Sequence, residues 1–173
     1  MGGEMRGMSD TPLTGLFNEE APALAPDSKV AAVIVQQGKI LDFIDGHTQR
    51  EETPEEYVRQ EIAKSLVREY DYAKRNIAVE FTVRMGSRKP RADLVVFYPG
   101  KPHKQEEAYL IVECKAQSVK SSDRKEGVGQ LQSYMTACLN SRYGMWTNGL
   151  ERFCYRVAGD EDGRSKRRQL TSS

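Results

Sequence analysis

The sequence has 173 residues, enough for one domain of ordinary size with additional segments at its ends. It carries 26 basic and 25 acidic residues, so the net charge does not indicate a nucleic-acid or membrane partner. No apolar run approaches the roughly 20 residues that a membrane-spanning helix needs, which excludes an integral membrane protein of that kind. The three cysteines are odd in number and lack CxxC spacing, which favours free thiols in the cytoplasm.

The ends of the chain differ in composition from its centre. Residues 1–28 are rich in Gly, Pro and acidic side chains without periodicity, which predicts a disordered or tag-like segment lacking a secretory signal. Two β-rich runs within residues 29–46 indicate a hairpin that turns at residues 37–38. The charged stretch 158–173 is typical of a solvated tail or linker. The predicted folded domain therefore spans residues 29–157.

A first helix is predicted after Thr53. This residue is a typical N-cap, Pro54 suits the first helical position, and Glu56 completes a capping box. Apolar residues recur at helical spacing from Val58 onward, so the helix extends to about residue 70. Glu56 is therefore assigned a structural role.

The period of the apolar residues then changes to that of strands. Three strands are predicted, at residues 77–83, 91–98 and 109–116, with polar turns between them. A second helix at 127–140 and a closing hairpin around 148–149 follow. This order predicts an α/β fold, with a mixed sheet of four or five strands between helices on both sides.

The third of these strands, YLIVECKA, contains two charged residues in an otherwise apolar run. Since residues two apart point to the same face of a strand, Glu113 and Lys115 share a face with Ile111. The remaining residues of the strand point to the other face. The alternative interpretation is that this charged pair lies at a solvated strand end.

A second carboxylate, Asp93, enters the apolar strand at 91–98. Antiparallel pairing with the strand at 109–116 would bring Asp93 and Glu113 to the same edge of the sheet. Two adjacent carboxylates repel unless a cation lies between them, and Mg²⁺ is a hard ion that carboxylates hold. Lys115 would point into the same site and stabilise a phosphate oxygen or lower the pKa of a metal-bound water. The set predicts a phosphodiester-cleaving site.

The spacing of Asp93 and the Glu113-Cys114-Lys115 triplet resembles the PD-(D/E)xK nuclease superfamily. The flanking segments are similar to the N-terminal nuclease domain of the restriction subunit of type I restriction–modification enzymes. These segments are PEEYVRQEIAKSLVREYDY, IAVEFTVRMGSRKPRADLVVFYPG, LIVECKA, GVGQLQSYM and GMWTNGLERFCYRV. The resemblance runs from about residue 30 to 157. Ala92 replaces the proline of the superfamily pattern, a departure that type I nuclease domains often share.

This resemblance implies a restriction-endonuclease-like core and Mg²⁺-dependent hydrolysis of DNA, with Mn²⁺ as a substitute metal. Asp93 and Glu113 would bind the metal together with the backbone carbonyl of Cys114. Lys115 would stabilise the charge that develops on the phosphate. Gln130 and Tyr134 match a glutamine–tyrosine pair that follows the catalytic lysine in the family.

The resemblance implies that Gln130 and Tyr134 support the active site or contact the DNA backbone. The alternative is an ordinary helix with a half-buried Tyr134. Glu61 is a further candidate metal ligand, because a helix glutamate has this role in several branches of the superfamily. The alternative for Glu61 is a surface carboxylate paired with a nearby basic side chain. Glu80 could also approach the site from its strand.

Basic residues cluster beside the predicted site despite the neutral total. They would bind DNA phosphates without sequence preference. The alternative is that they belong to solvated turns. These residues are Arg84, Arg88, Lys89, Arg91, Lys120, Arg124 and Lys125.

DNA is the predicted partner, with no membrane partner. The sequence contains no GxxxxGK[ST] loop, so ATP-driven translocation would need another module. Helicase or translocase, methyltransferase and specificity modules, in the same chain or in separate ones, are therefore further predicted partners. Two other functions remain open. One is a non-cleaving DNA-binding or subunit-docking module of the same fold, and the other is a DNA repair or recombination nuclease.

Overall fold

The computed structural model describes residues 34–159 and 165–170, so the segment 1–28, predicted to be disordered, lies outside the described residues. The first two strands, β1 (Lys39–Leu41) and β2 (Gln49–Glu51), pair antiparallel in a small sheet of their own.

A turn does lie at residues 37–38, where the Lys39 N–H donates to the Gln36 carbonyl at 3.1 Å, but most of the first arm of the hairpin predicted there lies outside the described residues. The hairpin that the structure describes is the one in which the chain reverses between β1 and β2. Two aspartates stabilise this reversal. Asp42 accepts a hydrogen bond from the backbone N–H of Ile44 at 2.8 Å, and Asp45 accepts one from Thr48 at 2.8 Å.

Helix α1 (Pro54–Arg68) begins where the capping motif predicts. The Thr53 hydroxyl accepts the backbone N–H of Glu56 at 3.1 Å, and Pro54 occupies the first turn. The helix ends two residues before the predicted boundary at about residue 70. Its buried apolar face includes Val58, Ile62 and Leu66, as the spacing predicts.

A buried ion network joins the small sheet to α1. The Arg59 side chain is only 4% exposed, and its Nη2 lies 3.0 Å from Oδ2 of Asp42. Arg59 also donates from Nε to Glu56 at 2.8 Å, while Arg50 of β2 donates to Asp42 at 2.5 Å. Burial opposes the charge on Asp42, but these cations and the Ile44 N–H hold its pKa below the ordinary value.

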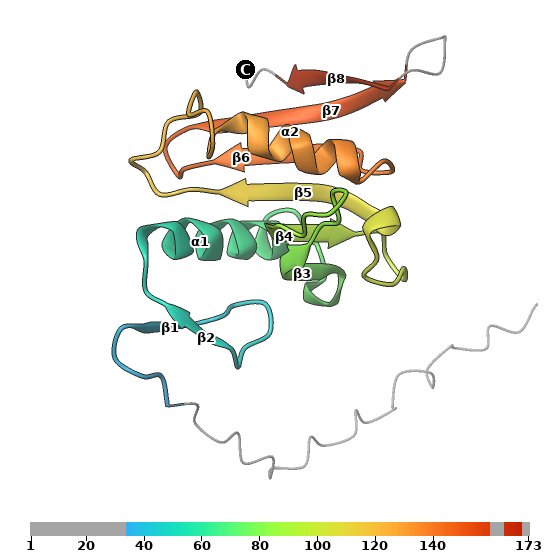
Figure 1. The fold of residues 1–173 in the computed structure, drawn as a ribbon. Coiled ribbons are helices and arrows are strands. Elements are labelled where there is room, and N and C mark those ends of the chain that lie inside the picture. Colours follow the sequence, from blue (N-terminus) through green and yellow to red (C-terminus); the bar gives the residue numbers. More distant parts are fainter. Residues whose placement is uncertain (1–33, 160–164, 171–173) are drawn as a thin grey trace, which may run out of the picture. The chain divides into compact units, whose positions relative to one another are not determined.

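The main sheet has six strands in the order β3-β4-β5-β6-β7-β8 (Figure 1). Its strands are β3 (Ile77–Thr82), β4 (Arg91–Phe97), β5 (Ala108–Cys114), β6 (Tyr143–Thr147), β7 (Arg152–Gly159) and β8 (Ser165–Leu170). Neighbouring strands are antiparallel except β5 and β6, which are parallel. Helix α2 (Val128–Ala137) makes the crossover between these two. Two short 3₁₀ helices, η1 (Lys74–Asn76) and η2 (Gln105–Glu107), precede β3 and β5.

This architecture confirms the predicted α/β class, and a mixed sheet with this helix order is compatible with a restriction-endonuclease-like core. The predicted tail from residue 158 is wrong in part, because β7 continues to Gly159 and β8 extends the sheet. The sequence of β8, SKRRQL, is rich in charge. Strands at the edge of a sheet tolerate such residues, so their composition resembles that of a solvated segment.

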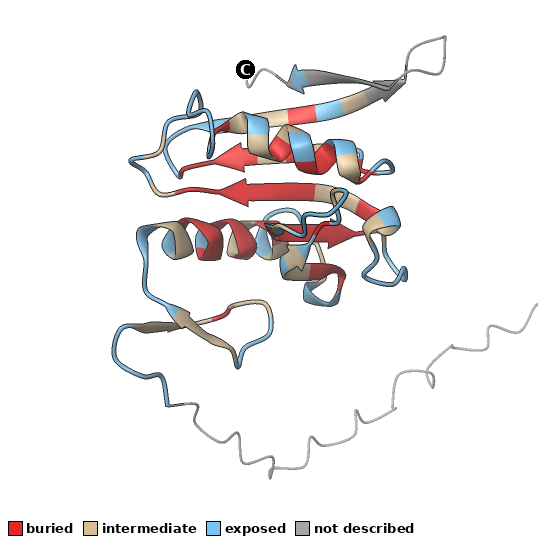
Figure 2. Ribbon diagram, viewed as in Figure 1, coloured by how far each residue is buried: buried red, intermediate tan, exposed pale blue. Residues whose placement is uncertain are grey.

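The two helices cover opposite faces of the sheet. In β5, Ile111 packs in the cluster that contains Leu131 of α2, whereas Val112 packs in the cluster that contains Leu66 of α1. Burial is concentrated in the central strands and on the helix faces that meet them (Figure 2). In the part of the chain that the structure describes, neither helix is long and apolar enough to cross a bilayer.

Candidate active site

Asp93 and Glu113 meet where β4 lies beside β5. Leu94 faces Val112 in the antiparallel ladder, so Asp93 and Glu113 are the next facing pair along these strands. The Asp93 carboxylate accepts a hydrogen bond from the backbone N–H of Cys114, at 2.7 Å. The two acidic residues are thereby brought to one place, and a backbone group fixes the orientation of Asp93.

Glu113 is buried together with a lysine. The residue is 1% exposed, Lys115 is 6% exposed, and the Lys115 Nζ lies 2.8 Å from the Glu113 Oε1. The other carboxylate oxygen, Oε2, is buried and receives no hydrogen bond from the described residues. A buried oxygen of this kind costs free energy unless a cation or donor occupies the space beside it.

The electrostatics of the two carboxylates are strongly perturbed. Burial raises the pKa of Asp93 to about 6, against the lowering effect of the Cys114 N–H and of Lys115. Burial and the neighbouring Asp93 raise the pKa of Glu113 to about 8, although Lys115 lowers it. Burial opposes the charge of Lys115, but the surrounding carboxylates outweigh it and hold that pKa above its ordinary value. The charged forms of both carboxylates are therefore disfavoured, and an additional cation beside them would stabilise these forms.

A third carboxylate, Glu55, lies at the same place and was not anticipated from the sequence. Its Oε1 is 3.7 Å from the Lys115 Nζ, and it sits in the first turn of α1. The signal was present in the Pro54-Glu55-Glu56 sequence, because acidic residues in a first helical turn face the positive end of the helix. Glu56 itself does not complete the predicted capping box, because its carboxylate accepts hydrogen bonds from Arg59 and Gln60 while the Thr53 N–H donates to the Glu51 carbonyl.

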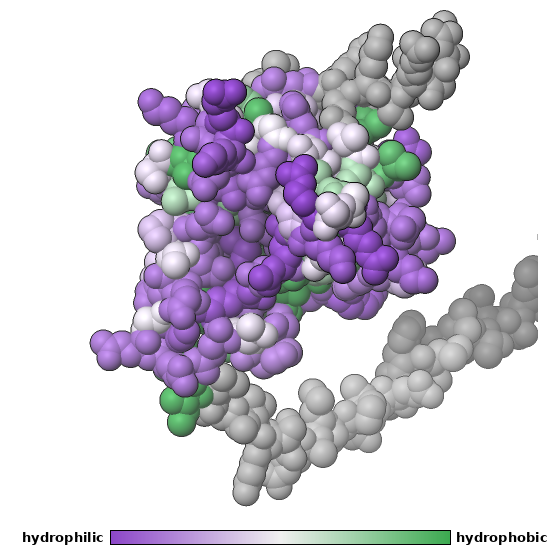
Figure 3. Space-filling model, viewed as in Figure 1, coloured by the Kyte–Doolittle hydropathy of each residue, from purple (hydrophilic) through white to green (hydrophobic). Residues whose placement is uncertain are grey.

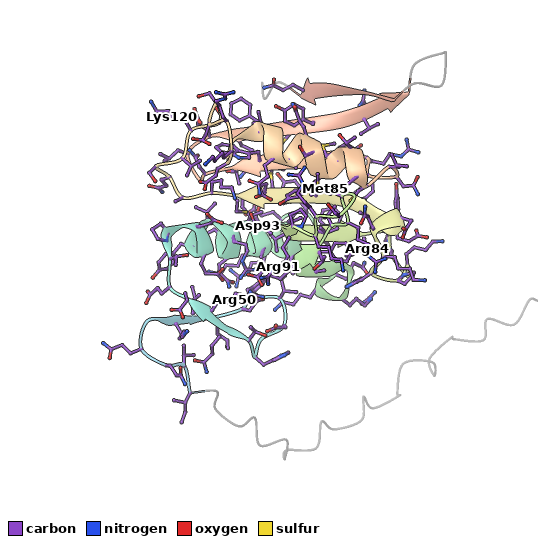
Figure 4. The ribbon with its side chains drawn as sticks, viewed as in Figure 1. Arg50, Arg84, Met85, Arg91, Asp93 and Lys120 are labelled. Atoms are coloured by element: carbon purple, nitrogen blue, oxygen red, sulfur yellow. The ribbon has the colours of Figure 1, made fainter. Side chains whose placement is uncertain are left out.

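A cavity of about 520 Å³ opens beside Asp93 and Glu55. Residues from β2, the start of α1, β3 and β4 line it. They are Thr48, Gln49, Arg50, Glu51, Thr53, Pro54, Glu55, Glu56, Arg59, Glu80, Asp93 and Ala116. In Figure 4, Arg50, Arg91 and Asp93 lie in one region, near α1 and the small sheet.

The remaining acidic candidates are placed differently. Glu61 is exposed and lies 2.6 Å from Lys64, so the structure does not bring it to Asp93 and instead shows the alternative of a paired surface carboxylate. Glu80 lines the cavity beside Asp93, with its carboxylate 3.1 Å from Arg91 and 3.2 Å from Arg50. Its φ of 50° lies in the left-handed region, which is uncommon for a residue other than glycine.

Gln130 and Tyr134 connect α2 to the strand that carries Asp93. Gln130 Nε2 donates to the Tyr134 hydroxyl at 2.9 Å, and this hydroxyl donates to the backbone carbonyl of Arg91 at 3.1 Å. Tyr134 is 2% exposed, with its ring in the core beneath α2. The pair therefore supports β4 two residues before Asp93.

The basic residues divide into separate groups. Arg88, Lys89, Arg124 and Lys125 line one cavity together with Gln130. Arg91 pairs with Glu80 instead, and Lys120 lies well away from Asp93 in Figure 4.

The acidic residues fit a hard cation. Within residues 34–159 and 165–170, no three His, Cys, Asp or Glu side chains are grouped as a metal site by themselves. Mg²⁺ does not require such a cage, since one or two carboxylates with water or backbone oxygens suffice. The unpartnered Oε2 of Glu113 and the raised pKa values of both acids suit this arrangement.

Comparison with known proteins identifies a family for this chain. The sequence family described as the type I restriction enzyme R protein N terminus matches residues 54–168, which is more than half of the chain. The match begins at α1 and includes Asp93, Glu113 and Lys115. No curated protein and no solved structure gave a significant match. The chain therefore belongs to the family of type I restriction enzyme R protein N-terminal domains.

Proposed function

We propose that this chain is a Mg²⁺-dependent endonuclease domain of a type I-like restriction–modification system and a member of the PD-(D/E)xK superfamily. One observation carries the proposal. The buried Oε2 of Glu113 has no hydrogen-bond partner among the described residues, and the same carboxylate contacts Lys115 and is close enough to Asp93 for that charge to raise its pKa. A purely structural ion pair would gain nothing from the unpaired oxygen or from the second buried acid.

Asp93, Glu113 and the backbone carbonyl of Cys114 would hold the metal, with Mn²⁺ as a substitute. When bound, Mg²⁺ supplies positive charge to the scissile phosphate and acidifies a water molecule. The Cys114 N–H fixes the orientation of Asp93. Lys115 keeps its proton at neutral pH, because the carboxylates around it raise its pKa. Its Nζ would stabilise the negative charge that develops on phosphate oxygens.

The family supports DNA and other restriction-system subunits as partners. A helicase or translocase, a methyltransferase and a specificity module are the proposed ones. The cytoplasm is the proposed location, since Cys114, Cys138 and Cys154 are free thiols.

The experiment that tests this proposal is a calorimetric titration with Mn²⁺. The wild type is compared with Asp93→Asn and Glu113→Gln, which preserve side-chain shape, and with Glu61→Gln as a matched control at an exposed carboxylate. We expect the wild type and the control to bind, and both site variants to lose at least about 10-fold in affinity.

Cleavage of supercoiled plasmid DNA is then measured in Mg²⁺ with the same four proteins. Nicking or linearisation by the wild type and the control alone would support an endonuclease. Metal binding without cleavage, even after addition of a cognate translocating module, would favour the non-cleaving DNA-binding or docking module. A wild type that binds no metal, with or without DNA, would overturn the proposal.

A further inference from the structure

A second groove lies on the α2 side of the sheet, apart from the acidic cavity at Glu55. Its volume is about 650 Å³. Three segments supply its lining: the turn 85–90 between β3 and β4, the loop 117–127 after β5, and α2. The lining residues are Met85, Arg88, Lys89, Pro90, Arg124, Lys125, Gly129, Gln130, Ser133 and Tyr134.

The charge of this groove is entirely positive. Arg88 and Lys89 come from the turn, Arg124 and Lys125 come from the loop, and no acidic residue belongs to the lining. None of the four cations forms an ion pair with a residue that the structure describes.

The cavity at Glu55 has the opposite character, since its acidic residues outnumber its basic ones. A polyanion approaching Asp93 would therefore be attracted on the α2 side and repelled on the side of the small sheet.

The loop that carries two of these cations is held in place from within the fold. Trp146 Nε1 donates to the carbonyl of Glu126 at 2.9 Å, and Asn148 Nδ2 donates to the carbonyl of Val119 at 2.9 Å. The Asp123 carboxylate accepts the backbone N–H of Glu126 at 2.8 Å. A Cβ at Gly127 would collide with backbone atoms of this same loop, so a glycine is required there. Ordering the loop before binding lowers the entropy that a ligand must offset.

The part of the groove formed by α2 suits phosphates better than bases. The space around Gly129 is open, so a ligand can approach the helix backbone closely. The N-terminus of α2 has no side-chain cap, and although the Val128 and Gln130 N–H groups donate to the Ser121 and Gly127 carbonyls, the helix dipole leaves partial positive charge at this end. The lining contains one aromatic ring, Tyr134, which is 2% exposed and unable to stack on a base. The face of the molecule drawn in Figure 3 is largely hydrophilic.

We propose that this groove binds the sugar–phosphate backbone of duplex DNA without sequence preference and directs it to the Asp93 site. This inference rests on the proposed nuclease function, because it identifies where the substrate of that site is held.

Binding is measured by fluorescence anisotropy of a short labelled duplex, in EDTA, over a series of NaCl concentrations. Four phosphate contacts give an expected slope of log affinity against log salt of about −3.6. Single changes of Arg88, Lys89, Arg124 and Lys125 to Gln should each reduce the slope by about 0.9 and weaken binding by about 2- to 10-fold. Lys101→Gln is the matched control, because this lysine is exposed outside the groove and should change neither quantity.

A second pair of variants tests the α2 side of the groove. Gly129→Asp places a negative charge in open space and should weaken binding by about 10-fold or more, whereas Gly129→Ser adds similar bulk without charge and should have little effect. Thermal unfolding of each variant verifies that it is folded.

Mn²⁺ titration of the same proteins separates this inference from the proposed function. If the groove variants bind DNA with the same affinity and salt dependence as Lys101→Gln and still bind Mn²⁺, the proposed role of the groove is wrong and the nuclease proposal stands. Weakened DNA binding in a protein that binds no Mn²⁺ would support the groove and overturn the metal site. Tighter binding of single strands than of duplexes would contradict the assigned ligand.

Discussion

The side chain of Asp93 accepts a hydrogen bond from the backbone N–H of Cys114, with 2.7 Å between the two atoms. This bond joins β4 to the end of β5 at the point where the acidic pair meets. Asp93 therefore has a structural role in addition to its proposed role as a metal ligand.

The two tasks of Asp93 are separable by substitution. Asp93→Asn keeps an oxygen acceptor for the Cys114 N–H, whereas Asp93→Ala leaves this backbone donor without its partner. We expect the alanine variant to be less stable than the asparagine variant by about 1–3 kcal/mol, with metal binding lost in both. Urea denaturation measures the first quantity and calorimetry the second. Equal stabilities would show that the hydrogen bond contributes nothing.

Lys115 is expected to matter for cleavage more than for metal binding. Lys115→Met removes the charge that lies 2.8 Å from Glu113 and retains the length of the side chain. Metal affinity should be kept or increased, because one positive charge is removed from the site, while cleavage should fall by about 100-fold or more. Lys64→Met, at an exposed lysine paired with Glu61, is the control. A cleavage rate within a few-fold of the wild type would exclude a direct role for Lys115.

The helix glutamate of the site is expected to be Glu55 and not Glu61. Glu55 approaches Lys115, whereas Glu61 is exposed and paired with Lys64. Glu55→Gln should therefore weaken Mn²⁺ binding by about 3- to 10-fold, and Glu61→Gln should leave it unchanged. The reverse order in calorimetric titrations would show that α1 presents a different face to the site.

The stability of the metal-free protein should depend on pH in a specific direction. The pKa values of Asp93 and Glu113 are raised from 3.8 and 4.5 to about 6 and about 8, so the folded protein binds more protons than the unfolded chain between these limits. The contribution of these groups is present in full below about pH 4 and is lost as the pH rises towards 8. The free energy of unfolding should therefore fall between about pH 4 and pH 8, and it should fall less in Glu113→Gln.

Thermal unfolding in EDTA across this pH range measures the effect. Saturating Mn²⁺ should reverse it, because the metal binds the deprotonated carboxylates and releases their protons. A stability that rises with pH from 5 to 8 in the absence of metal would contradict the raised pKa values.

The bonds between Gln130, Tyr134 and the carbonyl of Arg91 should stabilise the strand that carries Asp93. Tyr134→Phe removes the hydroxyl but keeps the buried ring, and it should cost about 1–2 kcal/mol of unfolding free energy. Cleavage should fall, since β4 would no longer be held beside the site. Gln132→Ala on the same helix is the control for urea denaturation, and an equal loss in both variants would indicate a general effect on α2.

The strands and helices of the central domain follow from local patterns in the sequence. The capping motif at Thr53 and the alternation in YLIVECKA depend on neighbouring residues, which is why α1 and β5 were predicted near their observed bounds. The meeting of Asp93 with Glu113 needed only one further assumption, the antiparallel pairing of β4 with β5, and the ladder confirms that pairing.

The features that were missed depend on contacts between distant parts of the chain. Glu55 approaches Lys115 because α1 packs across β4 and β5, which no local pattern specifies. The position of the first hairpin depends on Asp42, whose buried carboxylate forms ion pairs with Arg50 and Arg59. β8 lies at an edge of the sheet, where charged residues are tolerated. Its sequence therefore lacks the apolar alternation that would indicate a strand.

The ion network around Arg59 also determines the shortest fragment of this protein that is expected to form a stable fold. The family match begins at residue 54, at the first residue of α1. A truncation at that point would remove Asp42 and leave the buried guanidinium with Glu56 as its remaining carboxylate partner. Losing one member of a buried ion network costs about 3–5 kcal/mol, a large share of the stability of a small domain. Expression of the domain should therefore start before Lys39, even though the residues from 39 to 53 lie outside the matched family.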